Sequence, residues 1–255
     1  TIRNLTVEAT AKQVKGGNYV GVVIGRIGEG TIENVTAKGN VSAKGYVGGI
    51  AGYTYNTTLN KLYYTGQLTA TGYVGGITSY AYSKSFTECE TNDIVIKASA
   101  SQYVGGLVAY PVVAIYQCKA SGTITLSGTH QGAYVGGLAG RSTNTISECS
   151  TDVTISSASV GGLTAGVVAY SGATIKRCSS AGTVTSAGSD AYTGGVVAKT
   201  SASTVVEDCY TTADVSGTLW TSGAVAYNYG KVNRCYASGN IASVYYGAGL
   251  VGVND

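Results

Sequence analysis

The sequence predicts an all-β protein in which residues 1–255 form a single right-handed parallel β-helix (β-solenoid) of about nine coils. Three observations support this prediction. A glycine-rich motif returns along the whole chain, a column of small apolar residues returns at the same interval, and the composition combines 38 glycines with one proline and no methionine. Two matching periods of about 28 residues indicate stacked coils.

The glycine motif is most complete in residues 46–52, which read Tyr-Val-Gly-Gly-Ile-Ala-Gly. Paired glycines permit a bend and a close approach between backbones, so we expect a coil corner at Gly48 and Gly49, with Ile50 pointing into the core. The first position of the motif recurs at intervals of 26 to 31 residues, at Tyr19, Tyr46, Tyr73, Tyr103, Tyr134, Leu163, Tyr192, Trp220 and Tyr246.

A second column is independent of the glycines. Each member follows a short segment of alternating polarity and precedes a turn, and the members are Leu5, Val35, Leu62, Cys89, Cys118, Cys149, Cys178, Cys209 and Cys235. Alternation of apolar and polar residues indicates a strand with one face in the core. This column is therefore expected to point inward on successive coils.

Within one coil we expect three short strands. Residues 31–37 form the first and end at Lys38–Gly39, residues 40–42 form the second with Val41 inward, and the glycine motif forms the third. Segments 80–85 and 127–132 vary between repeats and are expected as corner loops. Because Thr1 already lies inside a repeat, we also expect flanking domains of the same polypeptide.

The composition excludes several classes of protein. Charged residues make up 11% of the chain, against about 25% in typical soluble proteins. The net charge of +3 comes from scattered residues, so no nucleic-acid partner is expected. No apolar run approaches the roughly 20 residues needed to span a bilayer, so no direct membrane insertion is expected.

The motif in residues 46–52, preceded by Asn-Val-Thr-Ala-Lys-Gly-Asn-Val at 34–41, resembles the GLUG-type repeats of bacterial surface proteins. Residues 234–241, Arg-Cys-Tyr-Ala-Ser-Gly-Asn-Ile, match the same upstream pattern. The resemblance covers essentially the whole chain and departs from the pattern at Leu163. It implies a β-solenoid of an adhesin-like protein that is extracellular, on the bacterial cell surface or secreted.

The six cysteines repeat with the coil period and share their column with Leu5, Val35 and Leu62. Substitution by leucine and valine favours buried free thiols, although disulfides between neighbouring coils stay open as an alternative. The chain has one histidine and no Cys-x-x-Cys pair, so we expect no metal and no cofactor.

Catalytic groups do not converge in the sequence, and we expect no enzyme. Asp93 and Asp152 should lie two coils apart, and a His-Glu-x-x-His motif cannot be written with His130 alone. The residues that precede the cysteines alternate in charge, which favours cross-strand pairing on a solvated face, and they are Glu88, Gln117, Glu148, Arg177, Asp208 and Arg234.

A third column begins seven residues after each motif start, and it holds Arg26, Tyr53, Tyr80, Tyr110, Arg141, Tyr170, Lys199 and Tyr227. Tyrosine joins an apolar face to a hydrogen-bonding tip, so such a column suits a sugar ring or a protein ligand. The candidate ligand-binding residues are Tyr53, Tyr55, Tyr80, Tyr82, Tyr110, Tyr170 and Tyr227. A purely structural ladder at a coil corner is the alternative, and for the motif's first-position tyrosines it is the expected role.

The leading expectation is therefore a non-enzymatic bacterial cell-surface or secreted β-solenoid that acts as an adhesin stalk or binding rod. Its partner would be a glycan or protein of a host or neighbouring cell. The alternative is a carbohydrate-binding or polysaccharide-processing β-helix module.

Overall fold

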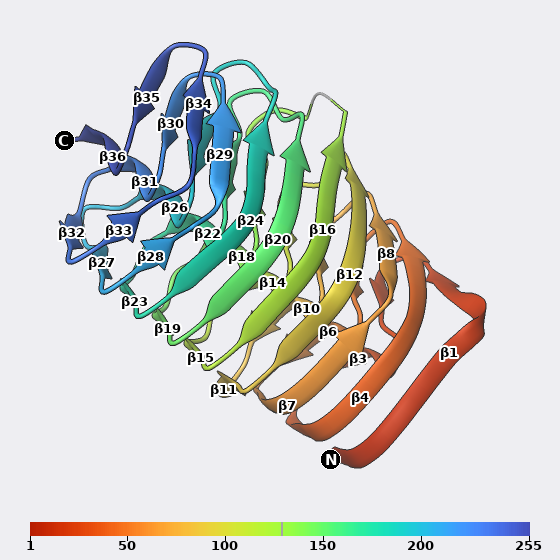
Figure 1. Cartoon of the computed structure of the whole chain (residues 1–255). Coiled ribbons are helices and arrows are strands. Elements are labelled where there is room, and N and C mark those ends of the chain that lie inside the picture. Colours follow the sequence, from red (N-terminus) through yellow and green to blue (C-terminus); the bar gives the residue numbers. More distant parts are fainter. Residues whose placement is uncertain (129) are drawn as a thin grey trace.

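Strands of successive coils pair in parallel along the whole chain. The computed structural model describes residues 1–128 and 130–255, and every regular element within these ranges is a strand. The strands form one 18-stranded sheet, here sheet A, and two nine-stranded sheets, here sheets B and C. In Figure 1 the chain runs upward through sheet A and returns behind it through sheets B and C, a right-handed path. The predicted fold class is confirmed.

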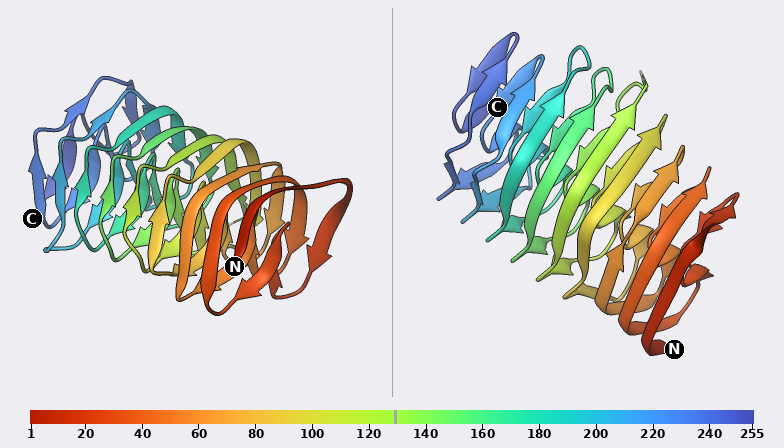
Figure 2. Two further views of the ribbon diagram at one scale, coloured as in Figure 1. Left: turned by 90° about the horizontal axis from the view of Figure 1, so that it is seen from below. Right: turned by 45° about the vertical axis from the view of Figure 1, so that its right-hand side comes forward.

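Sheets B and C each receive one short strand from every coil. Sheet B contains β2 (Tyr19–Val20), β5 (Tyr46–Gly48), β9 (Val74–Gly75), β13 (Tyr103–Gly105), β17 (Tyr134–Gly136), β21 (Leu163–Ala165), β25 (Tyr192–Gly194), β30 (Trp220–Ser222) and β35 (Tyr246–Ala248). Sheet C contains β3 (Ile24–Ile27), β6 (Ala51–Tyr55), β10 (Thr78–Tyr82), β14 (Val108–Pro111), β18 (Ala139–Ser142), β22 (Val168–Ser171), β26 (Val197–Thr200), β31 (Val225–Asn228) and β36 (Val251–Asn254). Figure 2 shows the coils stacked along one axis.

Sheet A is the broad face of the molecule, and most coils cross it in two or three pieces. Its strands are β1 (Ile2–Gly16), β4 (Gly30–Ala43), β7 (Thr57–Thr65), β8 (Gln67–Ala70), β11 (Ser85–Thr87), β12 (Glu90–Ser99), β15 (Ile115–Tyr116), β16 (Lys119–Ser127), β19 (Ile146–Ser147), β20 (Ser150–Ser157), β23 (Ile175–Lys176), β24 (Ser179–Ser186), β27 (Val205–Glu207), β28 (Tyr210–Thr211), β29 (Asp214–Gly217), β32 (Lys231–Asn233), β33 (Tyr236–Ala237) and β34 (Ile241–Ser243).

The expected division of a coil into strands was partly wrong. β4 continues through Lys38–Gly39, because Gly39 adopts a φ of 152° and packs against the backbone of Ala9 without a Cβ. The first two expected strands are therefore parts of one sheet. The glycine motif instead supplies two strands, β5 and β6, in different sheets.

The corner between sheets B and C follows from the paired glycines, as expected. A Cβ at Gly48 would collide with the carbonyl oxygen of Ala51, and a Cβ at Gly49 would collide with the ring of Tyr64. Ile50 is fully buried, as predicted. The motif is thus needed because two backbones approach too closely for any side chain.

The variable segments differ from the expected loops. Residues 80–82 belong to β10, so only residues 83–84 of the first segment lie outside strands. In the second segment Ser127 ends β16 and residues 128 and 130–132 connect it to β17, while Thr129 lies outside the described residues. No helix of the described ranges is long and apolar enough to cross a bilayer.

Candidate ligand-binding face

Sheet B presents a column of rings, here the rung column, formed by the first position of each glycine motif. Tyr103 and Tyr134 stack with ring centroids 5.1 Å apart, and the ring of Tyr46 lies 5.2 Å from Tyr19 and 5.0 Å from Tyr73. Parallel pairing in register sets this spacing, because neighbouring strands lie about 4.8 Å apart.

Sheet C presents the second column of rings and cations. Tyr53 and Tyr80 occupy paired positions and stack at 5.2 Å with an interplanar angle of 5°. Tyr55 and Tyr82 stack at 5.1 Å beside them, and both are about half exposed, at 46% and 48%. Tyr110 continues this column, 5.3 Å from Tyr80. Five of the predicted site residues therefore lie together.

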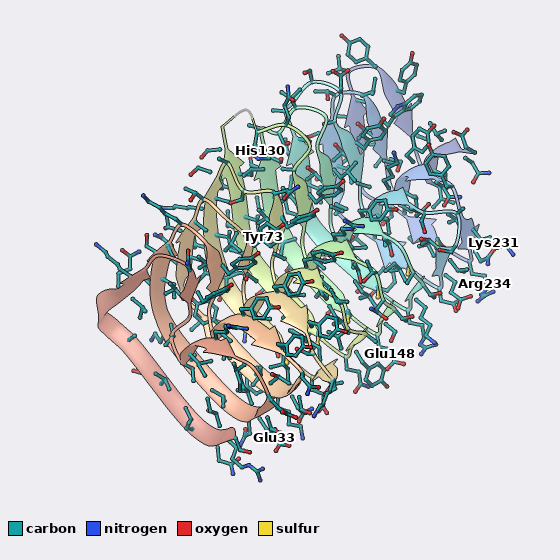
Figure 3. The ribbon with its side chains drawn as sticks, turned by 180° about the vertical axis from the view of Figure 1, so that it is seen from behind. Glu33, Tyr73, His130, Glu148, Lys231 and Arg234 are labelled. Carbon is teal, nitrogen blue, oxygen red and sulfur yellow. The ribbon has the colours of Figure 1, made fainter. Side chains whose placement is uncertain are left out.

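The two columns meet across the corner and form one surface, here the aromatic face. The rings of Tyr46 and Tyr53 lie 5.9 Å apart in an edge-to-face arrangement, and those of Tyr103 and Tyr110 lie 5.4 Å apart. Figure 3 shows Tyr73 in the middle of this side of the molecule, opposite the view of Figure 1. The first-position tyrosines thus belong to the candidate surface, which the sequence interpretation did not include.

Three cations are inserted into this surface, and each contacts rings. The Arg26 guanidinium lies 5.6 Å from the ring of Tyr53, and that of Arg141 lies 5.2 Å from Tyr110 and 5.5 Å from Tyr170. The Lys199 ammonium lies 5.4 Å from Tyr227. Within the described residues none of the three cations forms an ion pair. These cations therefore contact ring faces rather than carboxylates.

Packing on the aromatic face perturbs its hydroxyl groups. Burial, reinforced by the neighbouring Tyr103 and Tyr46, raises the pKa of Tyr73 to about 12. Burial also raises the pKa of Tyr80 and Tyr134. These phenols stay neutral at physiological pH. Tyr80 and Tyr134 keep a hydrogen to donate to a ligand, whereas Tyr73 donates its hydrogen to Gln102.

The remaining predicted residues, Tyr170 and Tyr227, lie farther along sheet C. Arg141 separates Tyr110 from Tyr170, and Lys199 separates Tyr170 from Tyr227 in the register of the sheet. The Tyr227 hydroxyl donates a hydrogen bond to Asp255. These two rings therefore belong to the same face but to its mixed, cation-bearing part.

The rung column changes where Leu163 replaces tyrosine. Leu163 is buried and joins Ala165, Ala169 and Ala198 in a small apolar cluster separate from the main core. Above this cluster is a hollow of about 180 Å³. Its lining consists of Gly132, Tyr134, Gly161, Leu163, Tyr170, Tyr192 and Lys199.

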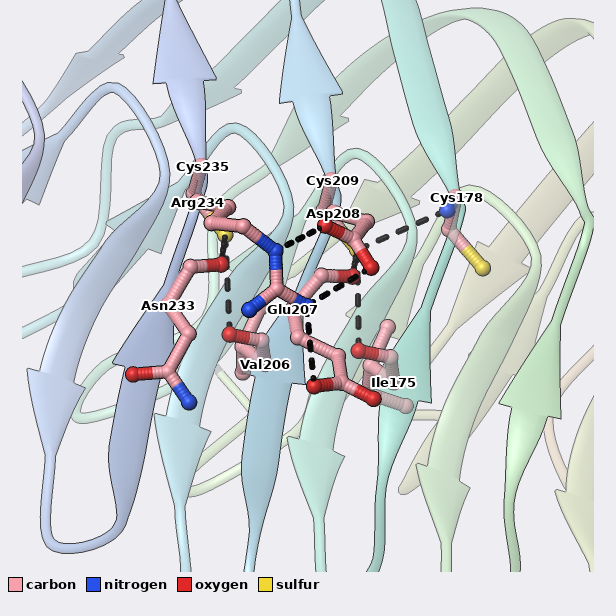
Figure 4. Close-up of polar contacts among 9 residues, drawn as sticks. All are labelled: Ile175, Cys178, Val206, Glu207, Asp208, Cys209, Asn233, Arg234 and Cys235. Atoms are coloured by element: carbon pink, nitrogen blue, oxygen red, sulfur yellow. Dashed lines mark hydrogen bonds and ion pairs between the residues drawn. The ribbon is translucent and has the colours of Figure 1, made fainter.

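Sheet A carries a different outward column, here the polar ladder, which the sequence had indicated. Its members all adopt left-handed φ values between 48° and 55°, and they are Asn4, Asn34, Lys61, Glu88, Gln117, Glu148, Arg177, Asp208 and Arg234. Glu148 accepts hydrogen bonds from Arg177 at 2.6 Å and from Gln117 at 3.1 Å. Arg234 pairs with Asp208, as Figure 4 shows. The predicted cross-strand pairing is confirmed.

The cysteine column lies directly behind the polar ladder. The six thiols are free, and Cys89 lies above Cys118, whose Sγ accepts a hydrogen bond from the Cys89 amide at 3.3 Å. Each thiol donates to the carbonyl two residues earlier, as Cys209 does to Glu207 at 3.2 Å (Figure 4). Burial holds the pKa of Cys118 well above its usual value. This column is packing, with little nucleophilic character.

The carboxylates of Asp93 and Asp152 do not come together. Asp152 pairs in register with Ser121, whose hydroxyl accepts the amide of Asp93 from the coil on its other side. Asp93 and Asp152 are thus two coils apart, as predicted. No group of three or more metal-ligating His, Cys, Asp or Glu side chains occurs in the described ranges.

No family model, no curated protein and no solved structure matches the chain. The function is therefore inferred from the side chains that sheets A, B and C present on the surface. The aromatic face combines stacked rings with cations that contact those rings and form no ion pair within the described residues.

Proposed function

We propose that this chain is the non-enzymatic β-solenoid segment of a bacterial cell-surface or secreted protein, and that it acts as an adhesin stalk or binding rod. The aromatic face is the observation on which this proposal rests. The resemblance of residues 46–52 to GLUG-type repeats supports the extracellular location and the adhesin-like class.

The aromatic face has the properties of a recognition surface. Tyrosine offers a large contact area at a small cost in conformational entropy, because the side chain has only two rotatable bonds. Rings in a stacked column are already ordered before a ligand arrives, so little entropy is lost on binding. Arg26, Arg141 and Lys199 add positive charge that no described carboxylate neutralises.

The ligand class that fits this surface is a glycan or a protein segment of a host or neighbouring cell. Sugar rings stack on tyrosine faces, and their hydroxyls can bond with phenol groups. Anionic groups on either ligand would pair with the unneutralised cations. A carbohydrate-binding module of the same fold is therefore the second candidate, and it shares this surface.

The test uses exposed rings whose removal leaves the core untouched. In the double variant Tyr55→Ala/Tyr82→Ala, we expect binding to a glycan and protein array to fall at least tenfold, with an unchanged circular dichroism spectrum. The matched control is Tyr210→Ala/Tyr236→Ala, an in-register pair on sheet A with exposures of 52% and 62%. Tyr53→Ala and Tyr80→Ala extend the test to the half-buried rings.

Equal loss of binding in the sheet A control would place recognition outside the aromatic face. Array binding that survives in all four sheet C substitutions would overturn the proposal. In that case the tyrosine columns would have only the structural role of a corner ladder.

A further inference from the structure

The hollow at Leu163 lies where the rung column lacks an aromatic ring. Ring-to-ring contacts run through the rung column from Tyr19 to Tyr134, and stacking resumes between Trp220 and Tyr246. Leu163 pairs in register with Tyr134 on one side and Tyr192 on the other. Its short side chain fills only the floor of the space that a ring would occupy.

The walls of the hollow are ring faces and bare backbone. Tyr134 and Tyr192 stand two strands apart, about 9.6 Å by the usual strand spacing, which leaves room for one ring between them. Tyr170 closes a side, 6.3 Å from Tyr134 between centroids. At the rim Gly161 adopts a left-handed φ of 60° and has no atom within 4 Å of its Cβ position. The entrance is therefore open.

The volume of about 180 Å³ suits one ring rather than a larger ligand. Pockets for drug-sized molecules measure roughly 300–1,000 Å³. A single ring inside the hollow with its neighbours outside matches how a longer chain of sugars would lie along the aromatic face.

The charge at the hollow is positive and unneutralised. The Lys199 ammonium lies 5.7 Å from the ring of Tyr192, and no ion pair of the described residues includes it. The nearby Arg141 carries a second positive charge, and its Nε is buried without a hydrogen-bond partner. No acidic side chain lines the hollow. An anion on the ligand would supply the ion-pair partner that Lys199 lacks.

We infer that the hollow binds one sugar ring that carries a negative charge, such as a uronic acid residue of an acidic glycan. The ring replaces the missing rung between Tyr134 and Tyr192, above Leu163. Its anion pairs with the Lys199 ammonium at the rim. This inference rests on the proposed function, because it names the ligand class of one place on the aromatic face.

The experiment titrates methyl β-D-glucuronide into the full chain labelled with ¹³C at leucine methyl groups. We expect the methyl resonances of Leu163 to shift while those of Leu107, in the core, stay fixed. Leu163→Tyr identifies these resonances by their absence and completes the rung column. It should fold, since the position holds tyrosine in seven of the nine coils. In this variant glucuronide binding, followed by saturation-transfer NMR, should be lost.

Charge is tested separately with methyl β-D-glucoside, which has the same ring without the anion. The glucuronide should bind at least tenfold more tightly than the glucoside, and Lys199→Gln should remove this preference. Lys231→Gln removes an exposed cation of sheet A, outside the aromatic face, that forms no ion pair within the described residues. It should leave glucuronide affinity unchanged.

Three results would overturn the inference. They are unshifted Leu163 methyls at millimolar glucuronide, equal affinity for glucoside and glucuronide, and unchanged glucuronide binding in Leu163→Tyr. Failure of the proposed function is distinguishable. If Leu163→Tyr retains full array binding and Tyr55→Ala/Tyr82→Ala loses it, the binding face stands and the hollow is not its acidic-sugar site.

Discussion

Two outward surfaces are built from the same coil repeat: the polar ladder of sheet A and the aromatic face of sheets B and C. They differ in whether their charged side chains form ion pairs. On the polar ladder, Glu148 is paired with Arg177, and Asp208 with Arg234. On the aromatic face, Arg141 and Lys199 rest on rings without a carboxylate partner. The charges of the polar ladder pair with one another, whereas the cations of the aromatic face remain available to a ligand.

The two columns also differ in what they contribute to stability. Exposed ion pairs are worth about 0–1 kcal/mol each, because solvent screens them. Stacked rings bury apolar area and add about 0.5–1.5 kcal/mol for each aromatic pair. The aromatic face should therefore stabilise the coil stack more than the polar ladder does, in addition to any role in binding.

The largest expected effect is the loss of a central rung. Tyr103 is 7% exposed and contacts the rings of Tyr73, Tyr110 and Tyr134. Tyr103→Ala leaves a cavity among these rings and should lower the free energy of unfolding by about 3 kcal/mol, measured by urea denaturation. The variant protein should then unfold at a lower urea concentration than the parent, and its native circular dichroism spectrum should be unchanged.

The matched control comes from the polar ladder in the next part of the same coil. Gln117→Gly removes the hydrogen bond to Glu148 but suits the left-handed φ of 53° at that position. We expect a change within about 0.5 kcal/mol. A larger loss in Gln117→Gly than in Tyr103→Ala would reverse the ranking of the two columns.

A smaller effect separates the columns by pH. Hydrogen bonds from Arg177 and Arg234 lower the pKa of Glu148 and Asp208. Their contribution is therefore present above the unfolded pKa of about 4 and is lost as pH falls through the lowered folded values. Burial raises the pKa of Tyr73 to about 12, so its contribution is present below pH of about 10 and is lost as pH rises toward 12.

Urea midpoints measured across pH provide the check. Glu148→Gln should flatten the acid limb of the profile only, and Tyr73→Phe should flatten the alkaline limb only. The slopes are compared rather than the values at neutral pH, because Tyr73→Phe also loses a hydrogen bond to Gln102. An alkaline limb of equal slope in Tyr73→Phe and the parent protein would contradict this assignment.

The repeat period was enough to predict the fold and the register of each column. Glu148 and Arg177 pair because a constant period places them on neighbouring coils, and this contact was readable from spacing. The division of strands was not, since Gly39 continues a strand whereas Gly48 ends one. The close neighbour of Gly39 is the backbone of Ala9 on the adjacent strand, whereas that of Gly48 is the backbone of Ala51 after the corner. These neighbours are determined only when the coil has folded.

The same limit applies to the candidate site. Tyr53 and Tyr80 were identified as a column, but the contact between Tyr53 and Tyr46 depends on the angle between sheets B and C, which no periodicity encodes. The signal that could have revealed it is the spacing of seven residues, one corner apart, between two columns of rings. Leu163 was recognised as a departure from the motif, while the hollow above it required the positions of Tyr170 and Lys199.

The smallest effect concerns the cysteine column, which lies behind the polar ladder. Like the charges of that ladder, its thiols have partners within the protein. Denatured protein should react with six equivalents of a thiol reagent, and in the native protein Cys235 should react first, because it is the only one of the six thiols that is not fully buried. Reductant should leave the urea midpoint unchanged. The substitution Cys235→Ser should remove the fast native phase, whereas Cys178→Ser should not. Fewer than six reactive thiols after denaturation would show that neighbouring coils are joined by disulfides. In that case part of the stability assigned to packing along sheet A would belong to covalent crosslinks between neighbouring coils.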